Sequence, residues 1–442
     1  MNRLLTLGFF SRPFILLTPS NRKSIHFFFS LVLLLLLAFS FQVCHAQSLL
    51  WAKGFGNPGP LGGKIYGTGI KADASGNTYV TGYFYATADL DPGTGTANVI
   101  STGGADIFIA KYDVLGNYVW AKNIGGTSDD DSSSITIDGN GNVYVTGYFR
   151  GSADFDPGTG TANLASAGGA DIFLTKYDGA GNYLWAKNMG GAADDISTAI
   201  AVDAASHVYI TGSFNGSGDF DAGAGIASLT SMGGTDIFLT AYDDAGNYLW
   251  AKNMGGTGTD SSLAIALDAG GNVYITGSFT GTADFDGDVP VASFTSVGNA
   301  DIFWAKYDAA GGFVWAKTIG GTGDDVGRGI NVDVANNVNL TGSFSATVDF
   351  DAGAGTDNFT SYGGTDLYIA HYEASGNYVG SICTGDIGDD FGRSIATDAN
   401  GNIYMIGTYS STNSDIIIFK FDMTGYVEWA FDITGAGDDN GN

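Results

Sequence analysis

Pairs of aspartates separated by one residue recur at a fixed position in this sequence. Two carboxylates at i and i+2 of an extended segment point to the same side, where they repel each other. A divalent cation such as Ca²⁺ would relieve that repulsion, because Asp oxygens are ligands for hard cations. The candidate calcium ligands are Asp89, Asp91, Asp154, Asp156, Asp219, Asp221, Asp284, Asp286, Asp349 and Asp351.

The same pairs have a second interpretation as hydrated acidic turns. Asp91 and Asp156 are each followed by Pro and Gly, a common turn signal. A calcium loop of the Asp-x-Asp-x-Asp-Gly kind offers more ligands, and these pairs lack the third acid. The residues alone leave both interpretations open.

The pairs belong to a longer internal repeat. The tetrapeptide that begins at Tyr79 returns every 65 residues, and a Trp-Ala-Lys triplet keeps the same spacing. The tetrapeptide positions start at Tyr79, Tyr144, Tyr209 and Tyr274 and, with changes, at Asn339 and Tyr404. A fixed period is the signature of a repeat architecture. The chain therefore holds six copies, of which the last lacks 16 residues between Tyr409 and Asp415.

Each copy is expected to form four β-strands. In the second copy, alternating and β-rich segments run over Ser134–Asp138, Val143–Phe149, Asp171–Asp178 and Tyr183–Asn188. Asn and Gly between them favour tight turns. Repeated four-stranded antiparallel units predict an all-β fold, a β-propeller. The blades are expected at about residues 56–124, 125–189, 190–254, 255–319, 320–384 and 385–434.

Strand order places the aspartate pairs at one end of the blades. Because antiparallel strands alternate in direction, the loops after the second and fourth strands emerge together, opposite the Asn-Gly turns. The sequence predicts that Asp154 and Asp156 lie at this end while Phe155 points back into the blade. The Trp residues of the triplets are expected to pack between blades.

The segments "GNVYVTGYFRGSADFDPGTGT" and "GGADIFLTKYDGAGNYLWAKNMGG" resemble the bacterial seven-bladed β-propeller repeat family. The resemblance covers about residues 48–442. It implies a secreted or surface-exposed bacterial propeller, in a family usually without an assigned activity. The chain departs from a complete member in its short sixth copy and in stopping where a seventh copy would begin.

Both ends of the chain add expectations. Basic residues, an apolar run from Phe27 to Phe41 and small residues near Ala46 predict a signal peptide over residues 1–46, with a membrane anchor as the alternative. The mature propeller domain is expected over residues 47–442. A lone strand at Ser48–Phe55 matches the fourth strand of a blade. It indicates either a truncated seven-bladed ring or a six-bladed ring with one added edge strand.

Charge excludes some classes of partner. The formal net charge is −28, and removal of residues 1–46 takes four basic groups and no acid, leaving −32. Nucleic acid and anionic membranes are therefore not expected as partners. Gly and Asp are abundant and Glu occurs only at positions 373 and 428, a composition that favours turns and short strands over helices.

Catalysis has little support in the residues. The mature chain holds one cysteine, Cys383, and two histidines, His207 and His371, at unrelated positions of the repeat. No Ser/His/Asp or Cys/His set follows from their spacing. We therefore expect a binding or structural module whose acidic loops meet an extracellular glycan or surface protein, with no catalytic residue and no certain cofactor beyond a possible Ca²⁺. The alternative is a glycan-active hydrolase or lyase that uses loop Asp residues.

Overall fold

The computed structural model describes residues 51–54, 56, 64–287, 292–410, 414–422 and 426–433. The predicted signal peptide and residues 434–442 lie outside these ranges. Residues 1–52 and residues 53–442 form two separate compact units, and the blades belong to the second. No helix among the described residues is long and apolar enough to cross a membrane.

The described chain is all-β and forms six antiparallel four-stranded blades. This confirms the predicted propeller fold. The first blade holds β1 (Ile65–Ala72), β2 (Thr78–Phe84), β5 (Asp106–Tyr112) and β6 (Tyr118–Gly126); the second β7 (Asp131–Ile137), β8 (Val143–Asp154), β9 (Asn163–Tyr177) and β10 (Tyr183–Gly191); the third β11 (Ile196–Val202), β12 (Val208–Phe214), β15 (Asp236–Tyr242) and β16 (Tyr248–Gly256). The fourth holds β17 (Ser261–Leu267), β18 (Val273–Asp284), β19 (Ser293–Tyr307) and β20 (Phe313–Ile319); the fifth β21 (Val326–Val332), β22 (Val338–Phe344), β25 (Asp366–Tyr372) and β26 (Tyr378–Thr384); the sixth β27 (Phe391–Thr397), β28 (Ile403–Ser410), β29 (Ser414–Phe421) and β30 (Val427–Ile433).

The aspartate pairs lie in a hairpin between the second and third strands of five blades. In blades 1, 3 and 5 this hairpin is separate and consists of β3 (Thr87–Asp89) with β4 (Asn98–Ile100), β13 (Ser217–Asp219) with β14 (Ser228–Thr230), and β23 (Thr347–Asp349) with β24 (Asn358–Thr360). In blades 2 and 4 the same segments prolong β8, β9, β18 and β19. The four strands expected in the second copy are all present, and its two middle strands are longer than predicted because they continue into this hairpin.

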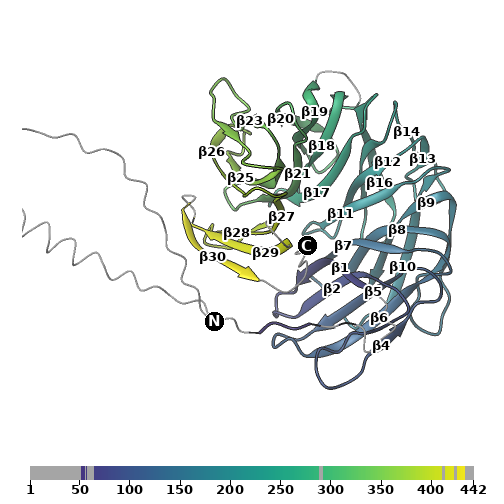
Figure 1. Ribbon diagram of the computed structural model, residues 1–442. Helices are drawn as coiled ribbons and strands as arrows, with labels where there is room; N and C mark the ends of the chain where they lie inside the picture. The colour runs from purple at the N-terminus through teal and green to yellow at the C-terminus, as the bar shows by residue number, and fades with distance from the viewer. Residues whose placement is uncertain are drawn as a thin grey trace, which may run out of the picture. The chain divides into compact units, whose positions relative to one another are not determined.

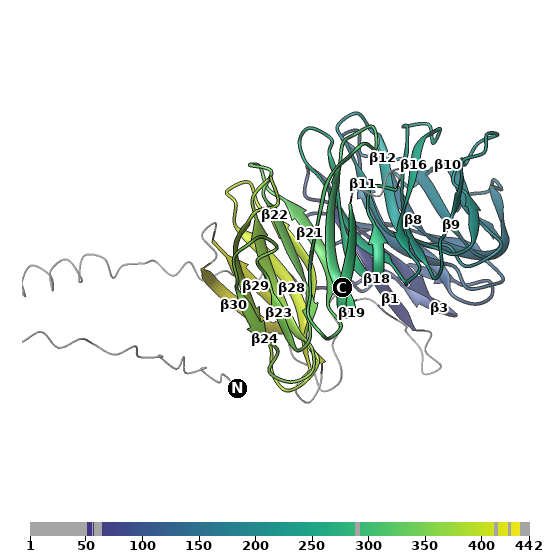
Figure 2. The ribbon, with the colours of Figure 1, turned by 90° about the horizontal axis from the view of Figure 1, so that it is seen from above.

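Successive blades pack through their first strands. Contacts join β1 to β7, β7 to β11, β11 to β17, β17 to β21 and β21 to β27. Figure 1 places these strands on the inner side of the sheets, and Figure 2 shows the same blades from above. We call them the innermost strands. Aromatic and aliphatic side chains that alternate along the strands fill the space between blades, among them Tyr144, Leu174 and Ile200. This apolar layer holds the end of each sheet in a fixed position.

Each of the two terminal blades has one face with exposed apolar side chains, which in the interior blades is covered by a neighbouring blade. Ile70 on β1 is 65% exposed, whereas Ile135 and Ile200, at the same position in the next two blades, are 4% and 6% exposed because a preceding blade covers them. On the other terminal blade, Ile416 and Ile418 of β29 are partly exposed. No described blade covers these faces. The seven-bladed ring stays a prediction.

The predicted lone strand at residues 48–55 is described only over residues 51–54, which carry no strand. The backbone contact comes at Gly56, whose carbonyl accepts a hydrogen bond of 2.9 Å from the N–H of Asp89. Gly125 pairs with Asp154 in the same register at the junction of blades 1 and 2. The segment therefore enters blade 1 in the register that the end of a fourth strand has elsewhere.

Candidate functional site

The hairpins and the loops after the fourth strands meet at one end of the blades, as predicted. Gly125 and Gly126 of β6 pair with the hairpin of the second blade, and the same pairing links β10 to β13 and β16 to β18. Phe155 is fully buried and contacts the rings of Phe149 and Phe173. Its burial turns the flanking carboxylates toward the loop. We call this end of the blades the loop face.

Each aspartate pair is tied to the backbone of its own hairpin. The Oδ1 atom of Asp154 accepts hydrogen bonds from the N–H groups of Asp156, at 3.0 Å, and Ala162, at 2.8 Å. The Oδ1 atom of Asp156 accepts the N–H of Gly158 at 2.8 Å. The first carboxylate thus joins the two arms of the hairpin and the second closes its tip.

This arrangement recurs in the other hairpins. The same three bonds are made by Asp89 and Asp91, by Asp219 and Asp221, and by Asp349 and Asp351, whereas for Asp284 and Asp286 the bond between the pair is described. All ten carboxylates are partly exposed. Within the described ranges, no three His, Cys, Asp or Glu side chains gather as a metal-ligand set. Calcium binding by the pairs stays a prediction.

A second set of aspartates, buried beneath the loop face, was not singled out from the sequence. Asp195 accepts the N–H of Gly191 at 2.7 Å and that of Asn215 at 3.1 Å, which ties the loop after β10 to the strand β12. Asp171 accepts the N–H of Ala167 at 2.9 Å, and its Oδ1 atom is buried without a partner among described residues. Burial raises the pKa of Asp171 and of Asp195 to about 6.

These buried carboxylates face each other in pairs. A Cβ on Gly190, whose φ of 142° suits glycine, would lie 2.7 Å from Oδ2 of Asp195 and 3.2 Å from Oδ1 of Asp171. The equivalent pairs are Asp106 with Asp130, Asp236 with Asp260, Asp301 with Asp325, and Asp366 with Asp390. Their invariance across the copies was the sequence signal that could have identified them. Complete burial assigns them to the framework, because a large ligand cannot reach them.

One position of the loop face carries a different side chain in each of five copies. The residue before the Gly-Gly or Gly-Asn of the third strand donates its N–H to a buried Asp, while its side chain is solvent-exposed. The five copies place Thr102, Ala167, Met232, Val297 and Tyr362 there. Met232 and Val297 are 59% exposed and Tyr362 is 76% exposed. Beside Tyr362, Gly363 contacts the backbone of Ile387, which is 71% exposed and replaces Thr or Ala of other copies.

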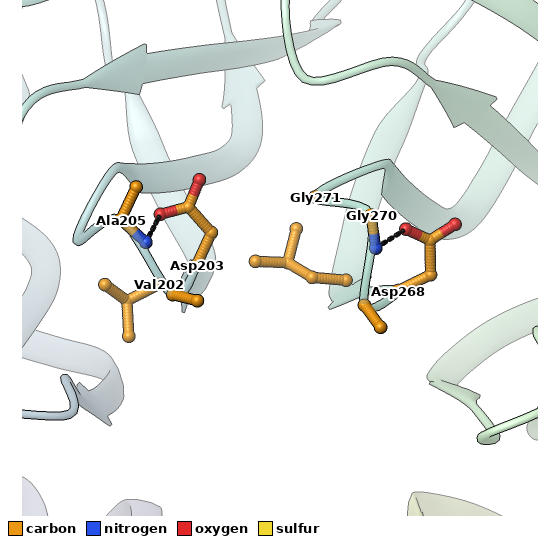
Figure 3. Close-up of a pocket in the computed structure, with 9 residues that line it drawn as sticks. Val202, Asp203, Ala205, Asp268, Gly270 and Gly271 are labelled. Atoms are coloured by element: carbon orange, nitrogen blue, oxygen red, sulfur yellow. Dashed lines mark hydrogen bonds between the residues drawn. The ribbon is translucent and has the colours of Figure 1, made fainter.

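The opposite end of the blades holds a hollow of about 460 Å³ between the turns of blades 3 and 4. Figure 3 shows Asp203 and Asp268 on its two sides, each accepting a backbone N–H from its own turn, from Ala205 and Gly270 respectively. Their second oxygens accept further bonds, Asp268 from the side chains of Asn272 and Tyr274. The hollow is therefore bounded by the backbone of the turns and by two aspartates whose oxygens already accept hydrogen bonds from those turns.

The histidines and the cysteine have structural surroundings. His207 Nδ1 lies 2.9 Å from Asp203 Oδ2, where other copies use Asn, and His371 Nδ1 lies 2.8 Å from Asn339 Oδ1. Burial lowers the pKa of His371 and raises that of the Cys383 thiol. Each is separately engaged with its own blade. Trp185, as predicted, packs between blades and donates its Nε1–H to the carbonyl of Asp244 at 3.2 Å.

A family model described as the β-propeller repeat, SBBP, matches residues 119–148. This match agrees with the fold, a β-propeller built from repeated blades. The chain is 27% identical over 278 residues to an uncharacterized WD repeat-containing protein of Acanthamoeba polyphaga mimivirus, a match that covers 54% of this chain and 20% of the relative. It is 26% identical over 232 residues to the regulatory protein FlaEY of Caulobacter vibrioides, a match that covers 50% of this chain and 24% of FlaEY. The chain thus spans a quarter or less of these relatives.

Solved structures show more distant likenesses. A protein of unknown function from Bacteroides caccae shares 9% identity at a TM-score of 0.37, with 74% of this chain and 90% of that chain covered. An ulvan lyase shares 12% sequence identity at a TM-score of 0.39, with 86% of this chain and 84% of the lyase chain covered. The NanB sialidase of Streptococcus pneumoniae shares 11% at a TM-score of 0.31, covering 87% and 62%. At these scores the likenesses carry no argument about function.

Proposed function

We propose that this propeller is a secreted or surface-exposed binding module whose loop face contacts an extracellular sugar chain or surface protein. The observation that carries the proposal is the exposed apolar set Met232, Val297, Tyr362 and Ile387 on otherwise near-identical loops. Exposed apolar groups on a soluble protein, when rimmed by polar residues, are typical of interaction sites. The aspartates Asp386 and Asp389, both at least partly exposed, lie beside Ile387 in the loop after β26, and Asp324 is exposed in the corresponding loop after β20.

The loops that carry these side chains are held in place before any partner arrives. The N–H of Tyr362 donates to Asp366 at 3.2 Å, and the N–H of Thr365 donates to Asp389 at 3.0 Å, so the segment is fixed at both ends. A loop that is already ordered loses little conformational freedom on binding, which favours affinity. The exposed Tyr ring offers a flat apolar surface with a polar tip, suited to sugar rings and to protein surfaces.

Repetition favours weak contacts made several times. Five hairpins of the same construction stand next to one another at one end of the blades. A partner with repeated units, such as a polysaccharide, can engage several of them at once and gain avidity without a strong single site. The formal net charge of −28 directs the loop face toward neutral or basic groups and away from nucleic acid. Calcium at the aspartate pairs would stiffen the hairpins in this proposal and would take no part in a reaction.

The test is binding of the mature chain to a glycan array and to extracellular proteins immobilised on a sensor. The double variant Tyr362→Ala/Ile387→Ala should bind its ligand about tenfold more weakly, because two apolar contacts are lost. The matched control is Val334→Ala, which removes a side chain that is 85% exposed on a turn at the opposite end of the same blade. Equal binding by the parent and both variants, or no ligand on either panel, would overturn the proposal. Cleavage of an array member would point to a glycan-active enzyme instead.

A further inference from the structure

One position of the innermost strands changes its chemistry in the last two blades. It is the bulged residue of each strand, left out of the pairing register between its two neighbours. The six copies place Thr68, Ser133, Thr198, Leu263, Arg328 and Arg393 there. β-Bulges redirect a side chain away from the sheet and are frequent beside functional sites. The residues before residue 47 aside, the chain has three arginines, and two of them occupy this position.

The bulged position lies where neighbouring innermost strands meet. In blade 3 the hydroxyl of Thr198 donates to the carbonyl of Ser262 on the next innermost strand at 2.7 Å. In the first blade the hydroxyl of Thr68 likewise lies 3.4 Å from that of Ser132 on the next innermost strand. Arginine is too long for this role, so the last two copies place different chemistry on β21 and β27, two of the innermost strands (Figure 1).

The two arginines converge on one aromatic ring. The Cζ atom of Arg328 lies 5.1 Å from the centre of the Phe391 ring, and that of Arg393 lies 5.0 Å from the same centre. Both arginines are partly exposed. Phe391 is the first residue of β27 and stands where other copies have Tyr, Asp, Ile, Ser or Val. Two cation–π contacts explain how the ring holds the guanidinium groups, but they do not neutralise the charges.

Neither guanidinium has an anionic partner among the described residues. The Nε atoms of Arg328 and Arg393 are buried, and no described residue accepts a hydrogen bond from them. Burial lowers the pKa of both arginines, and the neighbouring charge of Arg393 adds to the effect on Arg328. By contrast, Arg150 pairs with Asp194 at 3.0 Å and Lys176 with Asp244 at 2.5 Å. In a chain this rich in aspartate, a partly buried pair of cations without a carboxylate has an uncompensated cost that a bound anion would remove.

We propose that Arg328 and Arg393 form a binding site for a compact oxyanion, a carboxylate or a sulfate, on the innermost strands. Each guanidinium presents a planar fork of N–H donors that matches two oxygens of such a group through charge-assisted hydrogen bonds. The ring of Phe391 closes one side of the site. The strongly negative chain repels polyanions at long range, which selects a ligand with one or two negative charges.

This site is separate from the loop hairpins, so its test is independent of the partner proposed for the loop face. The oxyanion can arrive as a free inorganic ion or as the acidic group of a sugar acid. Inorganic sulfate, glucuronate and acetate are therefore the three probes, and each is titrated by calorimetry into the mature chain at constant ionic strength. Glucuronate that binds more tightly than both sulfate and acetate would identify a sugar acid as the source, and the reverse order would identify the free ion.

The decisive comparison uses three variants. Arg328→Gln/Arg393→Gln should abolish saturable binding, and Arg328→Lys, which keeps the charge but loses the fork, should weaken it about tenfold. Arg150→Gln removes an arginine on the outer part of the loop face and should leave binding unchanged. No saturable binding by the parent, or equal binding by all variants, would overturn the site. If the double variant fails to fold, Arg328→Lys decides alone, and binding by that variant equal to the parent's would likewise overturn the site.

Discussion

The aspartates of the loop face and the arginines of the innermost strands illustrate two opposite uses of charge. Asp154 and its equivalents recur in five copies, and their oxygens accept hydrogen bonds from hairpin N–H groups. Arg328 and Arg393 occur only in the last two copies, and their Nε atoms have no hydrogen-bond partner in the described part of the chain. The difference teaches that the repeated aspartates of this protein build the blades, whereas the two arginines, which depart from the repeat, carry the site that we propose for a ligand.

The largest expected effect concerns the repeated acids as a group, and it appears in the pH dependence of stability. Burial raises the folded-state pKa of Asp171, Asp195 and Asp260 to about 6 and that of Asp130 to about 7, above the ordinary 3.8. Between pH 3.8 and these raised values the folded state binds more protons than the unfolded state, so stability is lost progressively as the pH rises from about 4 to 6–7.

Aspartates in the exposed turns act in the opposite direction. Hydrogen bonds from Asn117 hold the pKa of Asp113 below 3.8, and those from Asn402 do the same for Asp398. Their contribution is present above about pH 4 and is lost as the pH falls further. We predict a stability maximum near pH 4, with a melting temperature at pH 8 clearly below it. A melting temperature that rises steadily from pH 5 to 8 would contradict the raised pKa values of the buried aspartates.

Single replacement of a buried acid should have the next largest effect. Asp195→Ala leaves the N–H groups of Gly191 and Asn215 without their acceptor, which should cost about 2–5 kcal/mol in the free energy of unfolding. Asp195→Asn keeps one acceptor oxygen and should lose less. Urea unfolding of both variants measures the difference. Loss of under about 0.5 kcal/mol by Asp195→Ala would show that this acid does not hold the blades together.

Replacement within a hairpin should cost less, because the hairpin is partly exposed. Asp154→Ala removes the acceptor that joins the two arms, at Asp156 and Ala162, and should cost about 1–2 kcal/mol. Asp156→Ala removes one bond at the exposed tip and should cost less than that. If Asp156→Ala proves the more destabilising in urea, the assignment of the arm-joining role to Asp154 is wrong.

Calcium should give the smallest effect on stability. A weak extracellular-type site with a Kd near 10⁻⁴–10⁻³ M would add about 0.4–1.4 kcal/mol per site at 1 mM Ca²⁺. The rise should disappear in a variant with Asp154, Asp156 and their counterparts replaced by Asn, and Mg²⁺ at equal concentration serves as control. An equal rise in that variant would place the calcium elsewhere.

The sequence predicted the propeller well because its repeat aligns the same strand pattern six times over. The 65-residue spacing located the four strands of each copy, and alternation around Phe155 located the loop face. It did not predict that Asp154 accepts the N–H of Ala162, since a bond between residues eight apart depends on the closed hairpin. The convergence of Arg328 and Arg393 was also missed, because the bulge that redirects them is a backbone feature.

One measurement tests most directly whether the exposed apolar residues of the loop face and the two arginines can be replaced without loss of stability. A variant reverted to earlier copies, Met232→Ala, Val297→Thr, Arg328→Thr, Tyr362→Thr, Ile387→Thr and Arg393→Thr, is compared with the parent by thermal unfolding, with array and sulfate binding recorded on the same samples. The melting temperature should stay equal or rise, since exposed apolar groups and unpaired charges are removed, while both binding activities are lost. A reverted chain that unfolds well below the parent, or that still binds as the parent does, would contradict the account.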